Sequence, residues 1–192
     1  MKSLQYLFIS LSHKILKHLP YTTIRILSVP IGTLYFLLTF RSSIKLFKRK
    51  EIFNELKINY KPLIVKINYT RYWLETLWLT NKNFSKYISP HVEIENLEYV
   101  EKLKKQYPGL IFALPHLGNW EFAIPIGNSI KLNLLAVAEP LNNSYVLNWF
   151  KSLRESLGIE IIIGGKGQNT FDLLVNKLKS GKDICLLSER SI

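Results

Sequence analysis

The chain has 192 residues, of which 47% are hydrophobic and 21% are charged, and its formal net charge at pH 7 is +12. This length is sufficient for one domain with a sizeable core. Apolar character combined with positive charge indicates contact with an anionic membrane surface. Nucleic acid is the usual alternative partner of a basic chain, but no zinc-finger, RRM or similar signature occurs in the sequence. The single cysteine, Cys185, excludes an internal disulfide, and no Cys/His cluster has the spacing of a metal site.

The first 50 residues differ in character from the rest of the chain. Residues 3–19 combine apolar and basic side chains at helical spacing, and residues 26–40 form an uncharged apolar run that precedes a basic cluster. A spanning helix needs about 20 apolar residues, whereas this run is shorter and contains Pro30 and Gly32. We therefore expect an interfacial or monotopic anchor rather than a single span. The basic cluster after the run favours the cytoplasmic face of the inner membrane, and no signal-peptide pattern is recognisable.

The segment from residue 51 to residue 80 is predicted to be helical, with a break near Pro62. Its second half, residues 68–79, is rich in aromatic side chains. Such a helix either packs on a sheet or lines a lipid-facing groove, and its pattern leaves both interpretations open. We divide the chain into an N-terminal membrane-associated helical segment (1–50) and an α/β domain (51–192).

From Val92 onward, short apolar runs alternate with amphipathic helical patterns. The predicted strands are residues 92–94, 110–114, 134–138, 159–163 and 183–187. The predicted helices between them are residues 97–106, 120–128, 144–157 and 170–179. Apolar strands that alternate with helices predict a largely parallel central sheet with helices on both faces.

The most informative stretch is Leu-Pro-His116-Leu-Gly-Asn-Trp-Glu121, directly after the predicted strand 110–114. His116 is expected on the loop and Glu121 in the first turn of the next helix. Residues five apart within one helix lie about 140° apart around its axis, whereas a loop followed by a helix lets the two side chains meet. A carboxylate against an imidazole fixes the tautomer and raises its basicity, which a general base acting on an alcohol needs.

Further charged residues are predicted at the same edge of the sheet. Those that follow a predicted strand are His116, Glu139 and the pair Glu189-Arg190. In parallel sheets, functional residues lie beyond the carboxyl ends of the strands. The sequence therefore predicts that these side chains converge. The turn at residues 164–167 lacks the spacing and the Lys-Ser/Thr pair of a Walker phosphate loop, which disfavours ATP binding.

The string from Pro115 to Glu121 resembles the His-x4-Asp/Glu motif of the lysophospholipid acyltransferase superfamily. More narrowly, it resembles the bacterial branch that acylates glycolipids, which contains the lipid A late acyltransferases and the phosphatidylinositol mannoside acyltransferases. Residues 71–75, Arg-Tyr-Trp-Leu-Glu, are similar to a segment of the second group. The resemblance covers residues 60–190. Because the sequence stops at Ile192, where members of the family continue, we expect an apparently C-terminally truncated member.

The resemblance implies a role for each candidate residue. His116 corresponds to the general base, and Glu121 to the acidic member of the motif. Glu139, in Ala-Val-Ala-Glu-Pro-Leu, corresponds to an acid of the acceptor site, and Arg154 to a residue linked to binding of a polar headgroup. The pair Glu189-Arg190 stands where many members have Asp-Arg, which implies a catalytic acid and a substrate-binding cation. Whether Glu121 or Glu189 orients His116 is left open.

The resemblance also implies the reaction. A fatty acyl chain would pass from acyl-CoA or acyl carrier protein to a sugar hydroxyl of a membrane glycolipid, first of all a phosphatidylinositol mannoside. A lipid A lauroyl- or myristoyltransferase is one alternative. A truncated, inactive lipid-binding remnant is another. The resemblance implies no metal and no cofactor other than the acyl donor as co-substrate, and no nucleic acid as a partner.

Overall fold

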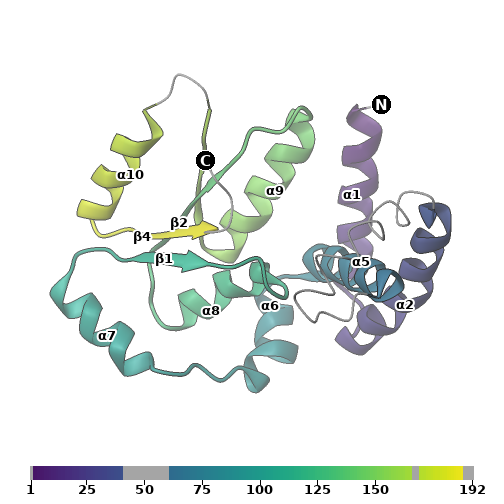
Figure 1. Ribbon diagram of the computed structural model, residues 1–192, viewed down its shortest axis with the longest axis horizontal. Helices are drawn as coiled ribbons and strands as arrows, with labels where there is room; N and C mark the ends of the chain where they lie inside the picture. The colour runs from purple at the N-terminus through teal and green to yellow at the C-terminus, as the bar shows by residue number, and fades with distance from the viewer. Residues whose placement is uncertain (1, 41–60, 166–168, 188–192) are drawn as a thin grey trace, which may run out of the picture. The chain divides into compact units, whose positions relative to one another are not determined.

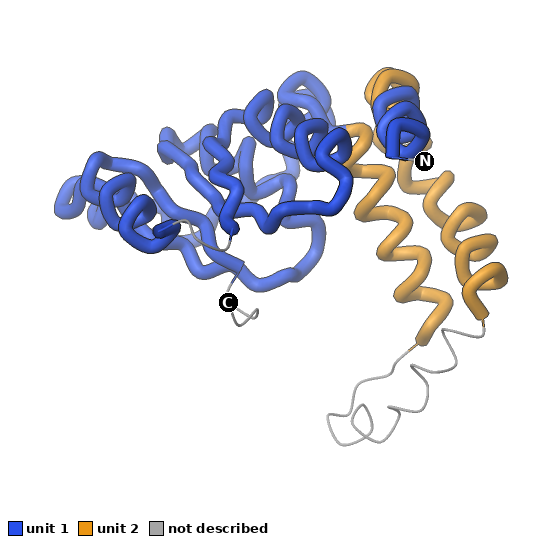
Figure 2. Tube along the Cα trace, turned by 90° about the horizontal axis from the view of Figure 1, so that it is seen from above, with its two compact units in different colours: residues 1–12, 79–192 blue, residues 13–78 orange. Residues whose placement is uncertain are grey.

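The computed structural model describes residues 2–40, 61–165 and 169–187. The chain forms two compact units, coloured separately in Figure 2: residues 1–12 with 79–192, and residues 13–78. The first unit contains a sheet with its helices, and the second is helical. The predicted boundary at residue 50 lies outside the described residues and stays a prediction.

The helical unit is built around α2 (Tyr21–Leu38) and α5 (Pro62–Trp78). The two helices approach closely at Gly32, where an added Cβ would lie 2.6 Å from the Cα atom of Ile67. Only glycine permits this approach, because any side chain would collide with the backbone of α5. α5 begins at Pro62, the residue near which a break was predicted, and proline is favoured in the first turn because its missing N–H needs no partner there.

α2 is long and apolar enough to cross a membrane by length and composition alone, with a mean hydropathy of 1.3. Pro30 lies inside this helix without ending it. Of its apolar window, 17% is buried. Its exposed apolar side chains include Ile26, Leu34, Leu37 and Leu38. α1 (Lys2–Leu16) precedes it and corresponds to the helix predicted over residues 3–19.

In the described part of the other unit, four parallel strands form a sheet in the order β1-β4-β2-β3. They are β1 (Ile111–Leu114), β2 (Leu134–Ala138), β3 (Glu160–Ile163) and β4 (Asp183–Leu187). Figure 1 shows β1 and β4 side by side. The α/β class and the parallel sheet are therefore confirmed. The strand predicted at residues 92–94 is wrong: this stretch is irregular and pairs with no described strand, because it only links a short 3-10 turn to the next helix.

The helices predicted between the strands are all present. They are α7 (Leu97–Gln106), the 3-10 turn η3 (Trp120–Phe122) with α8 (Ala123–Ser129), α9 (Ser144–Leu157) and α10 (Thr170–Lys179). Short helical turns precede them: α6 (Asn81–Asn83), η1 (Phe84–Ile88) and η2 (Ser89–His91). α9 shows how local sequence sets the ends, because Asn143 caps its first turn and Gly158 ends it in the left-handed region at φ +104.

Helices cover both faces of the sheet. This follows from the contacts of two successive side chains of β3, which lie on opposite faces. Ile161 belongs to a buried cluster with residues of α8 and α9, among them Ile124, Leu153 and Leu157. Its neighbour Glu160 accepts a hydrogen bond from Lys177 of α10 at 2.6 Å. Since successive side chains of a strand point to opposite faces, α8 and α9 cover one face and α10 covers the other.

Candidate active site

The carboxyl ends of all four strands lie at one edge of the sheet, because the strands are parallel. His116 follows the end of β1 by two residues, and Glu139 follows β2 directly. β4 lies between these strands, so the two strand ends are about 10 Å apart at about 4.8 Å per strand. Glu189 and Arg190 lie outside the described residues, so the convergence of all the predicted charges stays a prediction.

His116 lies in the loop of residues 115–119, and its side chain is exposed. Gly118 adopts φ +62 in this loop, and an added Cβ would meet nothing within 4 Å. The loop ends at Asn119, whose Oδ1 accepts a hydrogen bond from the N–H of Glu121 at 3.2 Å and so caps η3. His116 therefore lies outside the helix and Glu121 in its first turn, as predicted.

Glu121 is a completely buried carboxylate, with 0% of its surface exposed. Arg154, in the last turn of α9, donates to both of its oxygens: Nη2 lies 2.8 Å from Oε1, and Nε lies 3.1 Å from Oε2. The Arg154 side chain is itself only 15% exposed. Two hydrogen bonds from an arginine compensate a buried carboxylate well for its lost hydration. The ion pair therefore allows Glu121 to be buried with its charge.

Aromatic rings hold the Arg154 guanidinium in place. Its central carbon lies 4.6 Å from the ring centroid of Trp120 and 5.4 Å from that of Phe150. Arginine stacks favourably on aromatic faces in a weakly hydrated setting. Trp120 belongs to η3 and Phe150 to α9, so the stack and the ion pair together fix η3 to α9. The loop that carries His116 therefore leads into a rigid support.

This pairing was missed by the sequence analysis, which assigned Glu121 to the motif and Arg154 to a headgroup. The structure brings the two residues together across 33 positions of sequence. Their roles toward His116 and toward a substrate stay predictions. The available signal was weak: an arginine in the last turn of a predicted helix usually complements the helix dipole, and nothing local indicates a distant carboxylate.

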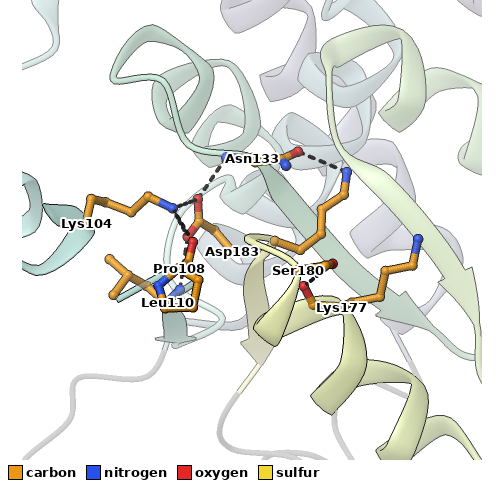
Figure 3. Close-up of polar contacts among 8 residues, drawn as sticks. Lys104, Pro108, Leu110, Asn133, Lys177, Ser180 and Asp183 are labelled. Carbon is orange, nitrogen blue, oxygen red and sulfur yellow. Dashed lines mark hydrogen bonds and ion pairs between the residues drawn. The ribbon is translucent and has the colours of Figure 1, made fainter. Parts of the chain in front are cut away.

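A second buried carboxylate lies at the amino edge of the sheet (Figure 3). Asp183, the first residue of β4, is 0% exposed and accepts from Lys104 Nζ at 2.8 and 3.1 Å. It also accepts from the backbone N–H groups of Leu110 at 3.0 Å and Asn133 at 2.8 Å. Asp183 thus joins the segments that enter β1 and β2 to β4. No sequence pattern predicts this cluster, because its members come from four separate segments.

Two titrating side chains near these strands have shifted pKa values. Hydrogen bonds from Lys177 and then from Lys182 lower the pKa of Glu160. Burial, followed by the charge of Asp183, raises the pKa of the Cys185 thiol to about 11. Cys185 is therefore protonated at neutral pH and packs against the core cluster, which agrees with its expected place in a buried strand.

The described residues at the carboxyl edge of the sheet include groups that can exchange protons. No group of three or more His, Cys, Asp or Glu side chains within residues 2–40, 61–165 and 169–187 could hold a metal ion. The groups at the carboxyl edge are the imidazole of His116 and the carboxylate of Glu139, beside the anchored Glu121. An imidazole and carboxylates can accept, hold and return a proton, so the arrangement fits acid–base chemistry.

Comparison with known proteins adds the chemical class. The phosphatidylinositol mannoside acyltransferase of Mycobacterium tuberculosis (strain CDC 1551 / Oshkosh) is 30% identical over 128 residues, which cover 65% of this chain and 40% of that protein. That of Mycolicibacterium smegmatis is 29% identical over 129 residues, 65% of this chain and 41% of that protein. The match thus spans about two fifths of these curated relatives. The model of the bacterial lipid A biosynthesis acyltransferase family matches residues 3–192, and the chain therefore belongs to that family.

Proposed function

We propose that this chain transfers a fatty acyl group from a thioester donor, acyl-CoA or acyl carrier protein, to a sugar hydroxyl of a membrane glycolipid. Family membership supports acyl transfer as the reaction class. The observation that carries the proposal is the position of His116. Its exposed side chain follows the carboxyl end of β1, on a loop whose next turn is anchored through the buried pair of Glu121 and Arg154.

In the proposed reaction, His116 accepts the proton of the acceptor hydroxyl while its oxygen attacks the thioester carbonyl carbon. A tetrahedral oxyanion forms and collapses, so that the C–O ester bond forms and the C–S bond breaks. The leaving thiolate takes the proton back from the imidazolium. A carboxylate that faces the positively charged imidazolium stabilises it during this cycle. Glu121 and Glu189 are the two candidates for that acid, and the reaction needs no metal or redox cofactor.

We assign acceptor binding to Glu139 and Arg190 in the first place. Glu139 is exposed and follows β2 directly, at the carboxyl edge of the sheet. Arg154 was predicted to bind the headgroup as well, but two of its donors face Glu121 and only 15% of its side chain is exposed. Its main contribution in this proposal is to hold η3, and through η3 the His116 loop, in a fixed place.

We also propose that the chain acts as a peripheral or monotopic protein at the cytoplasmic face of the cell membrane. The first 40 residues contain four lysines and arginines and no acidic residue. α2 and α5 expose apolar side chains in the helical unit, among them Ile26, Leu37, Ile64 and Tyr69. An apolar and basic surface fits a bilayer with anionic headgroups, where both the acceptor and the product reside.

The preferred acceptor is a phosphatidylinositol mannoside, because the relatives reported above carry that acceptor in their names. A lipid A precursor is the second candidate, because the family model that matches residues 3–192 is described by lipid A biosynthesis. Both acceptors present a sugar hydroxyl next to acyl chains, so the same base and the same membrane surface would serve either one.

The test is acyl transfer by the purified chain from labelled palmitoyl-CoA, with a mannosylated phosphatidylinositol and a lipid A precursor assayed in parallel. We expect label in the first acceptor. His116→Ala should lower turnover by about 10²–10⁴-fold, the usual contribution of a general base, without changing the melting temperature, because this side chain is exposed. His91→Ala, at another exposed histidine of the same unit, is the matched control and should retain activity. Equal turnover in His116→Ala would refute the proposed role.

A further inference from the structure

The first three turns of α1 turn an apolar helix face to solvent. The apolar side chains on this helix face are 59–71% exposed: Leu4, Leu7, Phe8 and Leu11. A helix of a soluble protein normally shows the reverse arrangement, with its apolar stripe toward the core. The exposed stripe therefore indicates that an apolar partner covers it.

The side chain of Asn143 contacts the first turn of α1. Its Nδ2 donates to the carbonyl oxygen of Lys2 at 3.0 Å and to Oε1 of Gln5 at 2.8 Å. Beside this contact, the rings of Tyr6 and Tyr145 lie 6.1 Å apart. These contacts occur within one compact unit, which includes residues 1–12.

The oxygen of the Asn143 side-chain amide caps a second helix, α9. Its Oδ1 accepts from the N–H groups of Tyr145 at 3.2 Å and Val146 at 3.4 Å, and so caps α9. Asn143 ends the short connection between β2 and α9, which begins with Glu139. One amide thus links the first turn of α1, the start of α9 and the loop that contains a candidate acceptor-binding residue.

We propose that Asn143 is a positioning residue that couples binding of α1 to an anionic phospholipid bilayer to the order of residues 139–147, the loop after β2 and the first turn of α9. The partner is a lipid surface, because the exposed stripe is apolar and residues 1–40 carry four basic and no acidic side chains. Insertion of the apolar face into the bilayer restrains the motion of α1. The hydrogen bonds of Asn143 to Lys2 and Gln5 then restrain the loop that Asn143 ends. The consequence for catalysis rests on the proposed function, whereas the coupling itself does not.

The test variant is Asn143→Ser. A serine hydroxyl still caps a helix, but it is too short to reach Lys2 and Gln5, so only the link to α1 is lost. Asn169→Ser is the matched control, because Asn169 caps α10 in the same way. Lipid insertion is followed by an environment-sensitive dye at Leu7→Cys in a Cys185→Ala background. Loop order is followed by amide hydrogen exchange over residues 139–147. The probes are vesicles of phosphatidylcholine with and without phosphatidylglycerol.

We expect anionic vesicles to raise the dye signal in all variants and to slow loop exchange about fivefold in the parent chain, the factor that one hydrogen bond contributes. This slowing should be absent in Asn143→Ser and retained in Asn169→Ser. Equal slowing in Asn143→Ser, or no entry of the dye into lipid, would overturn the proposal. These readouts do not depend on turnover. If acyl transfer is absent but the coupling is observed, the proposed function fails and this inference stands.

Discussion

The sheet unit contains two buried ion pairs that look alike and differ in what surrounds them. At the amino edge, Asp183 faces Lys104; beyond β1, Glu121 faces Arg154. Both carboxylates are 0% exposed. Asp183 also accepts two backbone N–H groups from neighbouring segments. The Glu121 oxygens instead face an arginine that stacks on aromatic rings.

This difference separates a carboxylate that joins strand entries from one that anchors the turn after the His116 loop. Backbone N–H groups are fixed by the chain path, so the Asp183 cluster holds the entry of three strands together (Figure 3). The Glu121–Arg154 pair instead fixes one turn that follows the His116 loop. A buried ion pair is weak evidence for stability in itself, because desolvation offsets the attraction. The contrast predicts that the first pair controls stability and that the second also controls activity.

The largest effect on stability is expected from Asp183→Ala. It leaves the N–H groups of Leu110 and Asn133 without their acceptor and removes the counter-charge of Lys104. We expect a loss of about 3–5 kcal/mol in the free energy of unfolding, measured by urea denaturation. Activity per folded molecule should stay at the parent level. A loss below that of an exposed ion pair would contradict the structural role of Asp183.

Glu121→Gln comes next, since it keeps the side-chain volume and removes the charge. A glutamine can still accept a hydrogen bond from Arg154 through its amide oxygen, so we expect a smaller stability loss of about 2–3 kcal/mol. Acyl transfer should fall about 10²-fold, because a small displacement of the His116 loop misplaces the base. The measurement is turnover at a temperature where circular dichroism shows a fully folded variant. Full turnover there would remove the distinction between the two pairs.

Arg154→Lys tests whether geometry matters beyond charge. A lysine ammonium keeps the positive charge but makes no bidentate contact and stacks poorly on Trp120 and Phe150. We expect a loss of about 1–2 kcal/mol in stability and a partial loss of turnover. Lys151→Met removes an exposed pair with Glu155 on the same helix and serves as the control with little effect. Identical results for both variants would leave the bidentate contact and the stacking of Arg154 without a role.

The smallest effect is expected from Glu160→Gln, at a half-exposed carboxylate bound by Lys177 and Lys182. Its stability loss at neutral pH should be below about 1 kcal/mol. Because these lysines lower the pKa of Glu160, its contribution is present above the unfolded value near 4.3. It disappears as the pH falls through the lower folded value. Denaturation curves at pH 7 and at acidic pH measure this, and a difference that grows in acid would contradict the assignment.

The sequence by itself determined the elements and the edge of the sheet. Apolar runs and helical spacing are local signals, and they predicted β2, β4, α7, α9 and α10 with the bounds that the structure gives. Caps such as Asn143 and glycines such as Gly158 fix where a helix begins and ends. The alternation of apolar strands with helices predicts a parallel sheet, and parallel strands share one carboxyl edge. The positions of His116 and Glu139 at this edge follow from that pattern alone.

Tertiary structure alone decided which side chains meet. Glu121 and Arg154 are 33 positions apart, and Lys104 and Asp183 are 79 apart. Such pairs depend on strand order and on how one helix rotates against another, which no local pattern encodes. The outward apolar face of α1 is a similar case. The sequence contains an amphipathic stripe, but packing contacts, among them those of Asn143, decide which side faces solvent. A periodic pattern defines a face of a helix, whereas packing selects what that face contacts.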